Sequence, residues 1–163
     1  MRRVSTIRKR IITILLVLTL AFIWGNSLLP REISGAASDR VMERMNRIAG
    51  AMGLGEDFFT VMADQDGDGV EEPTSRLVRK MAHIFEFAVL GALLWLRLEG
   101  MHRRVPWAFA LGISAAAMDE TLQIFSHRGS QLRDVLIDAV GTALGIAIIC
   151  AMDHIRNRRR QNR

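Results

Sequence analysis

The 163-residue sequence contains little cysteine and none of the motifs that mark common soluble enzymes. Its single cysteine, Cys150, excludes a disulfide within the chain. It has no phosphate-binding glycine loop, no nucleophile elbow and no zinc motif. Basic and aromatic residues are not interleaved, so we expect no nucleic-acid partner. We therefore predict no cofactor, and composition alone leaves catalysis open.

Charge is absent from long stretches, although 24% of the residues are charged and 50% are apolar. The run from Ile11 to Leu29 has no ionisable group in 19 positions. About 20 helical residues, rising ~1.5 Å each, cross a ~30 Å hydrocarbon layer. The pattern predicts an all-α integral membrane four-helix bundle with an extracytoplasmic loop or short helix between helices one and two. The expected segments are a basic N-terminus at 1–10, helices at about 11–29, 77–98, 105–125 and 135–152, an outer loop at 30–76, and a basic tail at 153–163.

The first run has one alternative interpretation, a secretory signal cleaved near Gly35-Ala36-Ala37. Signal peptides usually have only ~7–15 apolar residues, and Arg31-Glu32 separate this run from the cleavage-like site. An uncleaved anchor is therefore favoured. The later runs could instead be core helices of a soluble protein. Their length argues against this, as do tryptophans near the ends of the runs, which suit the headgroup region: Trp24, Trp95 and Trp107.

Basic residues concentrate in three segments, the N-terminus at 1–10, the turn at 97–104 and the tail at 153–163. In a four-pass chain these segments lie on one side of the membrane. Because cytoplasmic segments carry an excess of Lys and Arg, both termini are expected in the cytoplasm. We predict a multi-pass protein of the bacterial plasma membrane. The net charge of +5 favours anionic membrane lipid as a partner, and the oligomeric state is not predicted.

The expected outer loop contains two patterned stretches. Val41, Met45, Ile48 and Met52 recur at helical spacing, which predicts a helix lying on the membrane surface or, slightly favoured, packed over the bundle. The segment 64–69 resembles the opening of a calcium loop, with acidic residues at Asp64, Asp66 and Asp68 followed by Gly69. Position twelve is Ser75 where such a loop needs a bidentate Glu, so a solvated acidic turn is favoured.

The ionisable residues of the later apolar runs lie toward the outer ends of those runs, at one common depth. On helices three and four they continue stripes of small residues, Gly112 on the first and the Gly141–Gly145 pair on the second, which let helices approach closely. Polar side chains in a bilayer generally face the bundle interior. The residues concerned are Lys80, His83, Glu86, Asp119, Glu120, Gln123, Arg133, Asp134 and Asp138.

This cluster has two interpretations. As structural glue, Lys80, Arg128 and Arg133 would neutralise the acids of helices three and four. As a site, which we favour, the cluster lines an outward-facing pocket, because ionisable residues within a membrane are functional candidates. The catalytic candidates are then His83, Glu86, Asp119 and Glu120, and the substrate-binding candidates are Lys80, Gln123, Arg128, Arg133, Asp134 and Asp138. Lys80 and the arginines compete for the carboxylates, so no metal site is predicted, and His83 is the expected partner of Glu86.

Three stretches together resemble the VanZ-like family. They are RKMAHIFEFAVLGALL, DETLQIF and the segment RDVLIDAVGTALG, which cover roughly 79–149. Phe87 stands where the family more often has Tyr, the region of Asn26, Ser27, Ser34 and Ser38 matches loosely, and the acidic segment 64–69 looks like an insertion. The family is named for a membrane protein linked to teicoplanin resistance. The resemblance implies a lipid-linked cell-wall precursor or a glycopeptide as partner, without a settled mechanism.

Three classes of function remain. The first is a non-enzymatic envelope protein that lowers glycopeptide access or alters lipid-linked precursors at the outer leaflet. The second is a membrane-embedded enzyme acting on a lipid-linked substrate, with His83 or Glu86 as base or acid. The third is an assembly partner or a small transporter. A self-contained transporter is disfavoured because the sequence shows neither an inverted repeat nor a broken helix.

Overall fold

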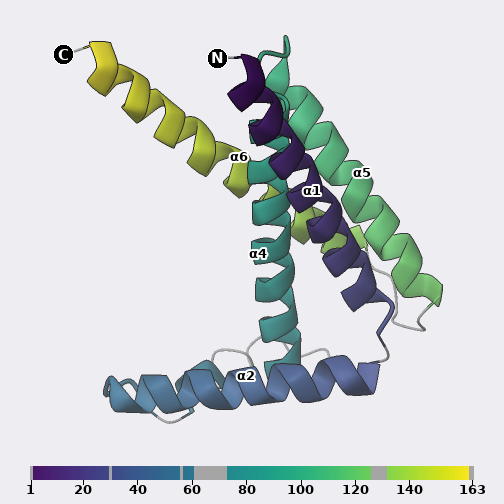
Figure 1. Ribbon diagram of the computed structural model, residues 1–163. Coiled ribbons are helices and arrows are strands. Elements are labelled where there is room, and N and C mark those ends of the chain that lie inside the picture. The colour runs from purple at the N-terminus through teal and green to yellow at the C-terminus, as the bar shows by residue number, and fades with distance from the viewer. Residues whose placement is uncertain (1, 30, 56, 61–72, 126–131, 162–163) are drawn as a thin grey trace. The chain divides into compact units, whose positions relative to one another are not determined.

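The computed structural model describes residues 2–29, 31–55, 57–60, 73–125 and 132–161. Within these ranges the fold is all-α, as predicted, and contains no strand (Figure 1). The labelled helices are α1 (Arg2–Ser27), α2 (Arg31–Ala51), α4 (Pro73–Arg97), α5 (Arg104–Phe125) and α6 (Leu132–Gln161). Residues 58–60 are also helical. The acidic segment 64–69 and Arg128, both named in the sequence predictions, lie outside the described residues.

The chain divides into two compact units. Unit 1 comprises Met1–Leu28 and His83–Arg163, and unit 2 comprises Leu29–Ala82. Helix α4 crosses the boundary, so its first ten residues belong to unit 2 and the remainder to unit 1. All the candidate site residues from His83 onward therefore belong to unit 1, whereas Lys80 belongs to unit 2.

Prolines and glycines mark the helix ends. Pro73 is the first residue of α4, where a missing N–H costs nothing, and Pro106 lies in the first turn of α5. Between these helices Gly100 has a φ of 85°, a conformation that favours glycine. Helix α4 begins four residues before the predicted start, and α6 continues nine residues past the predicted end at 152. An apolar run marks only the part of a helix suited to hydrocarbon, so it underestimates helices that continue in polar sequence.

Unit 2 contains α2, which is longer than the short helix expected from the sequence. At its end, Leu54 N donates to Ala49 O and Gly53 N donates to Gly50 O, both at 3.0 Å, with Gly53 at a φ of 80°. This pattern is a Schellman motif, which satisfies the last carbonyls of the helix. The packing of the Val41 stripe over the bundle stays a prediction, and within the described residues most of this stripe is exposed. Val41, Ile48 and Met52 are exposed, and the buried residues of α2 lie on the adjacent face: Ser38, Met42 and Ala49.

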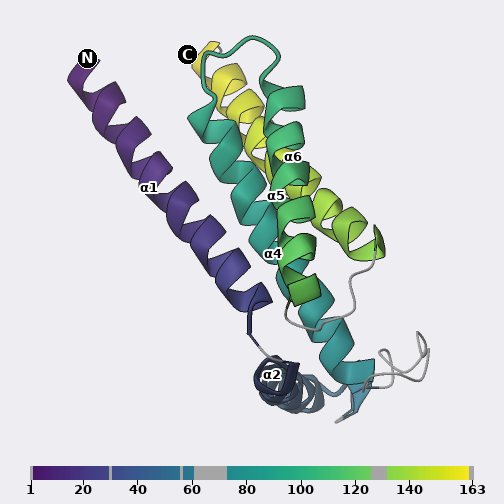
Figure 2. The same ribbon diagram turned by 90° about the vertical axis from the view of Figure 1, so that its right-hand side faces the viewer.

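In unit 1 consecutive helices run in alternating directions (Figures 1 and 2). The N-terminus, the connection between α4 and α5, and the C-terminus lie at one end of this unit in both views. The three basic segments therefore gather at one end. At this end Arg8 pairs with Glu99 at 3.1 Å, and Arg97 Nε donates to Thr13 Oγ1 at 2.9 Å.

Glycines bring α6 close to its neighbours, as the small-residue stripe predicts. A Cβ built on Gly141 would lie 2.6 Å from the carbonyl oxygen of Ile84 on α4. A Cβ on Gly145 would meet the backbone of Ala88, and one on Gly112 would meet the side chain of Thr142. Distances under 3.0 Å are not tolerated without movement of the neighbour. The backbones of α6 and α4 thus approach too closely for any larger side chain at Gly141 or Gly145.

The surface of unit 1 is apolar, while several polar side chains lie inside it. Asp119 and Thr142 have no exposed area and Ser27 has 1%, whereas Leu136 is 61% exposed. Water-soluble proteins rarely present apolar patches of this extent. By length and apolar composition, one described helical stretch, Arg133–Arg156, qualifies as a membrane span. The four predicted spans therefore remain a prediction.

Candidate functional site

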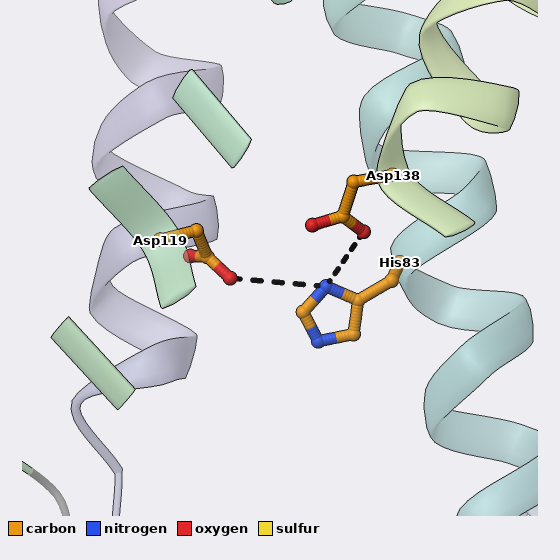
Figure 3. Close-up of side chains that lie close together, drawn as sticks. All are labelled: His83, Asp119 and Asp138. Atoms are coloured by element: carbon orange, nitrogen blue, oxygen red, sulfur yellow. Dashed lines mark ion pairs between the residues drawn. The ribbon is translucent and has the colours of Figure 1, made fainter. Parts of the chain in front are cut away.

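Three helices of unit 1 bring together one histidine and two aspartates. His83 comes from α4, Asp119 from α5 and Asp138 from α6 (Figure 3). Helical phase explains why Asp119 is inside: it shares a face with Gly112, Ala116 and Gln123, and all four are buried. Asp138 lies one turn before Thr142 on the buried side of α6. We call these three residues the His83 cluster.

The imidazole of His83 lies between the two carboxylates. Its Nδ1 is 3.3 Å from Asp138 Oδ1 and 3.9 Å from Asp119 Oδ2 (Figure 3). The side chain of His83 is 18% exposed, against 0% for Asp119 and 3% for Asp138. One ring nitrogen thus faces two buried acids and can donate at most one hydrogen.

Asp119 is held by neutral donors at both of its oxygens. Ser27 Oγ, at the end of α1, donates to Asp119 Oδ1 at 2.6 Å, and Gln123 Nε2 donates to Asp119 Oδ2 at 2.8 Å. Ser27 and Gln123 are themselves buried. Hydrogen bonds that orient a carboxylate fix which lone pairs remain for a further ligand. The geometry directs Oδ2 of Asp119 toward the imidazole (Figure 3).

Asp138 differs because its inner oxygen has no hydrogen-bond partner. Asp138 Oδ1 is buried, and its described contact is the ion pair with His83 Nδ1. One turn further along α6, Thr142 Oγ1 is also buried without a hydrogen-bond partner. Leaving such a group unsatisfied costs roughly 1–3 kcal/mol. Native proteins rarely retain this cost unless the group has a use.

Glu86 accepts its described hydrogen bond from α1 and not from His83. Asn26 Nδ2, on α1, donates to Glu86 Oε1 at 3.2 Å, while the ion pairs of His83 run to the two aspartates. His83 and Glu86 are neighbours in sequence on α4, but the described ion pairs of His83 run to carboxylates on the two facing helices. Glu86 therefore borders the cluster as a separately bonded group.

The other predicted site residues are distributed as follows. Glu120 and Gln123 are buried on α5, Asp134 is half-buried on α6, and Arg133 is exposed. Lys80 lies in the part of α4 that belongs to unit 2. Of the cations expected to neutralise the acids, neither Lys80 nor Arg133 forms a described ion pair with Asp138, whose described partner is His83.

Three residues of the site are not among the predicted site residues. Asn26 and Ser27 supply donors from α1, and Thr142 adds an unsatisfied hydroxyl beside the cluster. A signal existed for the first two, because they are adjacent polar residues that end an otherwise apolar run. Thr142 gives no such signal, since threonine is common in apolar helices.

A second polar group lies at the basic end of unit 1. Trp95 Nε1 donates to Asp153 Oδ2 at 3.1 Å, and the Arg104 guanidinium lies 3.8 Å from the Trp95 ring centroid. Arg104 Nε also donates to the carbonyl of Trp95 at 2.6 Å. Trp95 is thus buried within the unit, in contrast to the headgroup position expected for it, whereas Trp107 is exposed. These residues join α4, α5 and α6, and none of them is among the described side chains with a buried unsatisfied atom.

The fold and the cluster define a class of protein: an all-α chain with an apolar exterior and a buried His–Asp–Asp group. Within that class, this chain belongs to the VanZ/LLP1 family, because the model of that family matches residues 12–153. It is 40% identical over 67 residues to a Bacillus subtilis (strain 168) protein described as uncharacterized membrane protein YwnJ. That alignment covers 41% of this chain and 45% of the Bacillus protein. No solved structure matches the chain significantly.

Proposed function

We propose that this chain is a multi-pass protein of the bacterial plasma membrane with both termini in the cytoplasm. Three observations support this. The basic segments gather at one end of unit 1, as the positive-inside rule requires of cytoplasmic ends. The exterior of unit 1 is apolar, and the Bacillus relative is described as a membrane protein. The His83 cluster then lies toward the extracytoplasmic side.

We further propose that the cluster is a site, and that it serves the headgroup of a lipid-linked envelope precursor. The observation that carries this proposal is the unsatisfied Asp138 Oδ1 facing an imidazole nitrogen that Asp119 also faces. Structural glue is stable when every polar group is paired, and a partly satisfied buried network destabilises the fold. An incomplete network suits a ligand that completes it.

The substrate class follows from the position of the cluster in a helical bundle. A site among membrane-spanning helices is reached laterally by lipids, whose headgroups lie near the membrane surface. Family membership connects the chain to a protein named for teicoplanin resistance, and glycopeptides act on lipid-linked cell-wall precursors. The proposed biological effect is therefore a change in glycopeptide susceptibility through the amount or accessibility of such a precursor.

A membrane-embedded enzyme is the second candidate. The observation in its favour is that His83 is held by carboxylates on both sides, as in a general base whose imidazolium is stabilised by a buried acid. The two candidates share the site and differ in whether the lipid is altered.

Conservative variants of the two aspartates test the proposal. Asp119→Asn and Asp138→Asn keep the size of the side chain and remove its charge. In a deletion strain complemented with each variant, we expect both to lose the wild-type effect on teicoplanin susceptibility while keeping normal abundance. Glu99→Gln is the matched control, since it changes an exposed acid at the other end of unit 1. Normally abundant Asn variants with full effect would refute the site.

Lipids that co-purify with the protein distinguish the two candidates. Mass spectrometry of wild-type protein in mild detergent should detect a polyprenyl- or glycerol-linked phosphate that is depleted from Asp138→Asn. An enzyme also converts that lipid during incubation, whereas a binding protein returns it unchanged.

A further inference from the structure

We infer that His83, Asp119 and Asp138 bind a divalent transition-metal ion of the Zn²⁺ or Mn²⁺ kind. The ligand atoms are His83 Nδ1, Asp119 Oδ2 and Asp138 Oδ1, which all lie within 4.8 Å of one another (Figure 3). This departs from the sequence expectation of no metal, because the structure places His83 against both aspartates. The inference rests on geometry and charge, and it deepens the proposed function.

Distances between the donor atoms fit a metal. Zn–N and Zn–O bonds of ~2.0–2.2 Å at tetrahedral angles separate neighbouring ligand atoms by about 3.4 Å. Nδ1 and Asp138 Oδ1 are 3.3 Å apart, and Nδ1 and Asp119 Oδ2 are 3.9 Å apart. The first pair already has the spacing of two ligands on one ion. The second pair is wider, so binding of the ion by Asp119 requires its carboxylate to move toward His83.

The unsatisfied oxygen is the independent sign of a ligand. Asp138 is 2% exposed, and its Oδ1 points toward His83 without a hydrogen-bond partner (Figure 3). A single proton on Nδ1 can be donated to one carboxylate only, so it cannot neutralise the charge of both acids. A cation placed among the three atoms can be coordinated by all of them at once.

Charge balance favours a dication over a monocation. A metal-bound imidazole is neutral and both aspartates are ionised, so the protein ligands carry two negative charges. Each uncompensated buried charge costs several kcal/mol. A divalent ion brings the total to zero in an apolar surrounding. The mixed donor set is compatible with either ion, because imidazole suits Zn²⁺ and carboxylates suit Mn²⁺.

The surroundings match those of a metal site with an open position. Ser27 and Gln123 hold Asp119 by hydrogen bonds of 2.6 and 2.8 Å, as outer groups usually hold ligating carboxylates. Three protein ligands leave a fourth position for a water or for an oxygen of a bound substrate. A metal-bound phosphate oxygen explains how an acidic cluster attracts an anionic headgroup. Only this last step rests on the proposed function.

Metal binding to purified protein tests the inference directly. The chain carries a tag without histidine, is treated with EDTA in detergent, and is then dialysed separately against ZnCl₂ and MnCl₂. Mass-spectrometric metal analysis should find one ion per chain for at least one of the two metals. If wild-type protein holds no more of either metal than the dialysis buffer does, the inference is overturned. Protons, and not a metal ion, would then neutralise the two aspartates.

Matched variants locate the ion. We expect His83→Gln and Asp138→Asn to lose the bound metal, while His102→Gln and Asp39→Asn, which change exposed residues of the same types, keep it. Ser27→Ala, which removes a donor from Asp119, should weaken binding about 10–100-fold. Full binding by folded His83→Gln and Asp138→Asn would also overturn the site.

The two proposals fail independently. Metal bound by the wild type, with unchanged antibiotic susceptibility in the cluster variants, refutes the proposed function and leaves the metal site. Loss of the susceptibility effect in those variants, with no metal bound by the wild type, refutes the metal site and leaves the function.

Discussion

Individual side chains determine how well the buried aspartates of this protein are stabilised. Asp119 has no exposed area, and each of its oxygens accepts a hydrogen bond from a neutral group. Asp138 is almost equally buried and has an oxygen without such a bond. Two aspartates on neighbouring helices therefore differ in how many of their oxygens accept hydrogen bonds from the protein.

The hydroxyl of Ser27 is predicted to contribute measurably to stability. Ser27→Ala removes the donor to Asp119 Oδ1 in a buried position, so we expect a loss of about 1–3 kcal/mol, seen as a lower unfolding midpoint in detergent. Ser114→Ala is the control, because Ser114 is exposed and donates to Ala110 O within its own helix. It should change stability by no more than about 0.5 kcal/mol. Equal midpoints for the two variants would contradict the role of Ser27.

Residue identities could be predicted from the sequence better than residue partners. Acids and a histidine within apolar runs are visible in the sequence, and His83, Asp119 and Asp138 were all among the candidates. Spacing along α4 suggests Glu86 as the partner of His83, whereas the described hydrogen bond of Glu86 comes from Asn26 on α1. Partners across helices depend on how each helix is rotated about its axis, which packing determines and sequence spacing does not.

At the scale of whole helices, α6 is the element on which packing depends most visibly. Its Gly141 and Gly145 lie against the backbone of α4, and its Thr142 lies against Gly91 and Gly112. The same stretch carries Asp138, so close approach of the backbones also determines the distance from Asp138 to His83. Packing and site geometry are therefore coupled through one face of one helix.

A larger side chain at position 145 should separate these helices. Gly145→Leu places a Cβ where the Ala88 backbone lies, and we expect a loss of at least about 1–3 kcal/mol, measured as reduced thermal stability in detergent. Gly141→Leu should behave alike. Ile148→Leu, on the exposed side of α6, should cost less than about 1.5 kcal/mol. Wild-type stability in both glycine variants would show that the helices do not pack through this face.

Helix existence could be predicted from apolar runs, while helix length and the buried face of α2 could not. The run at 135–152 gives the apolar part of α6, but the helix extends to Gln161 because arginine and glutamine are also good helix formers. In α2 the apolar stripe of Val41 and Ile48 is exposed and the Met42 face is buried. A narrow stripe does not identify the inner face when small and polar residues pack as well.

For the molecule as a whole, the proposed membrane orientation makes a labelling prediction. In a Cys150→Ala background, a cysteine at position 57 should react with an impermeant maleimide added to intact cells. A cysteine at position 102 should react only after permeabilisation, because it lies in the basic connection at the proposed cytoplasmic end. Labelling of position 102 in intact cells would exclude the four-pass arrangement.

The His83 cluster and the serine that donates to it come from four different helices. Ser27 lies on α1, His83 on α4, Asp119 on α5 and Asp138 on α6. During synthesis Asp119 can meet Ser27 as soon as α5 is made, but His83 waits for α6 to supply Asp138. A ribosome-bound or truncated chain that lacks α6 therefore has no complete cluster. On the proposed function, a chain whose synthesis has not yet reached α6 cannot bind the precursor, because Asp138 is still missing from the cluster.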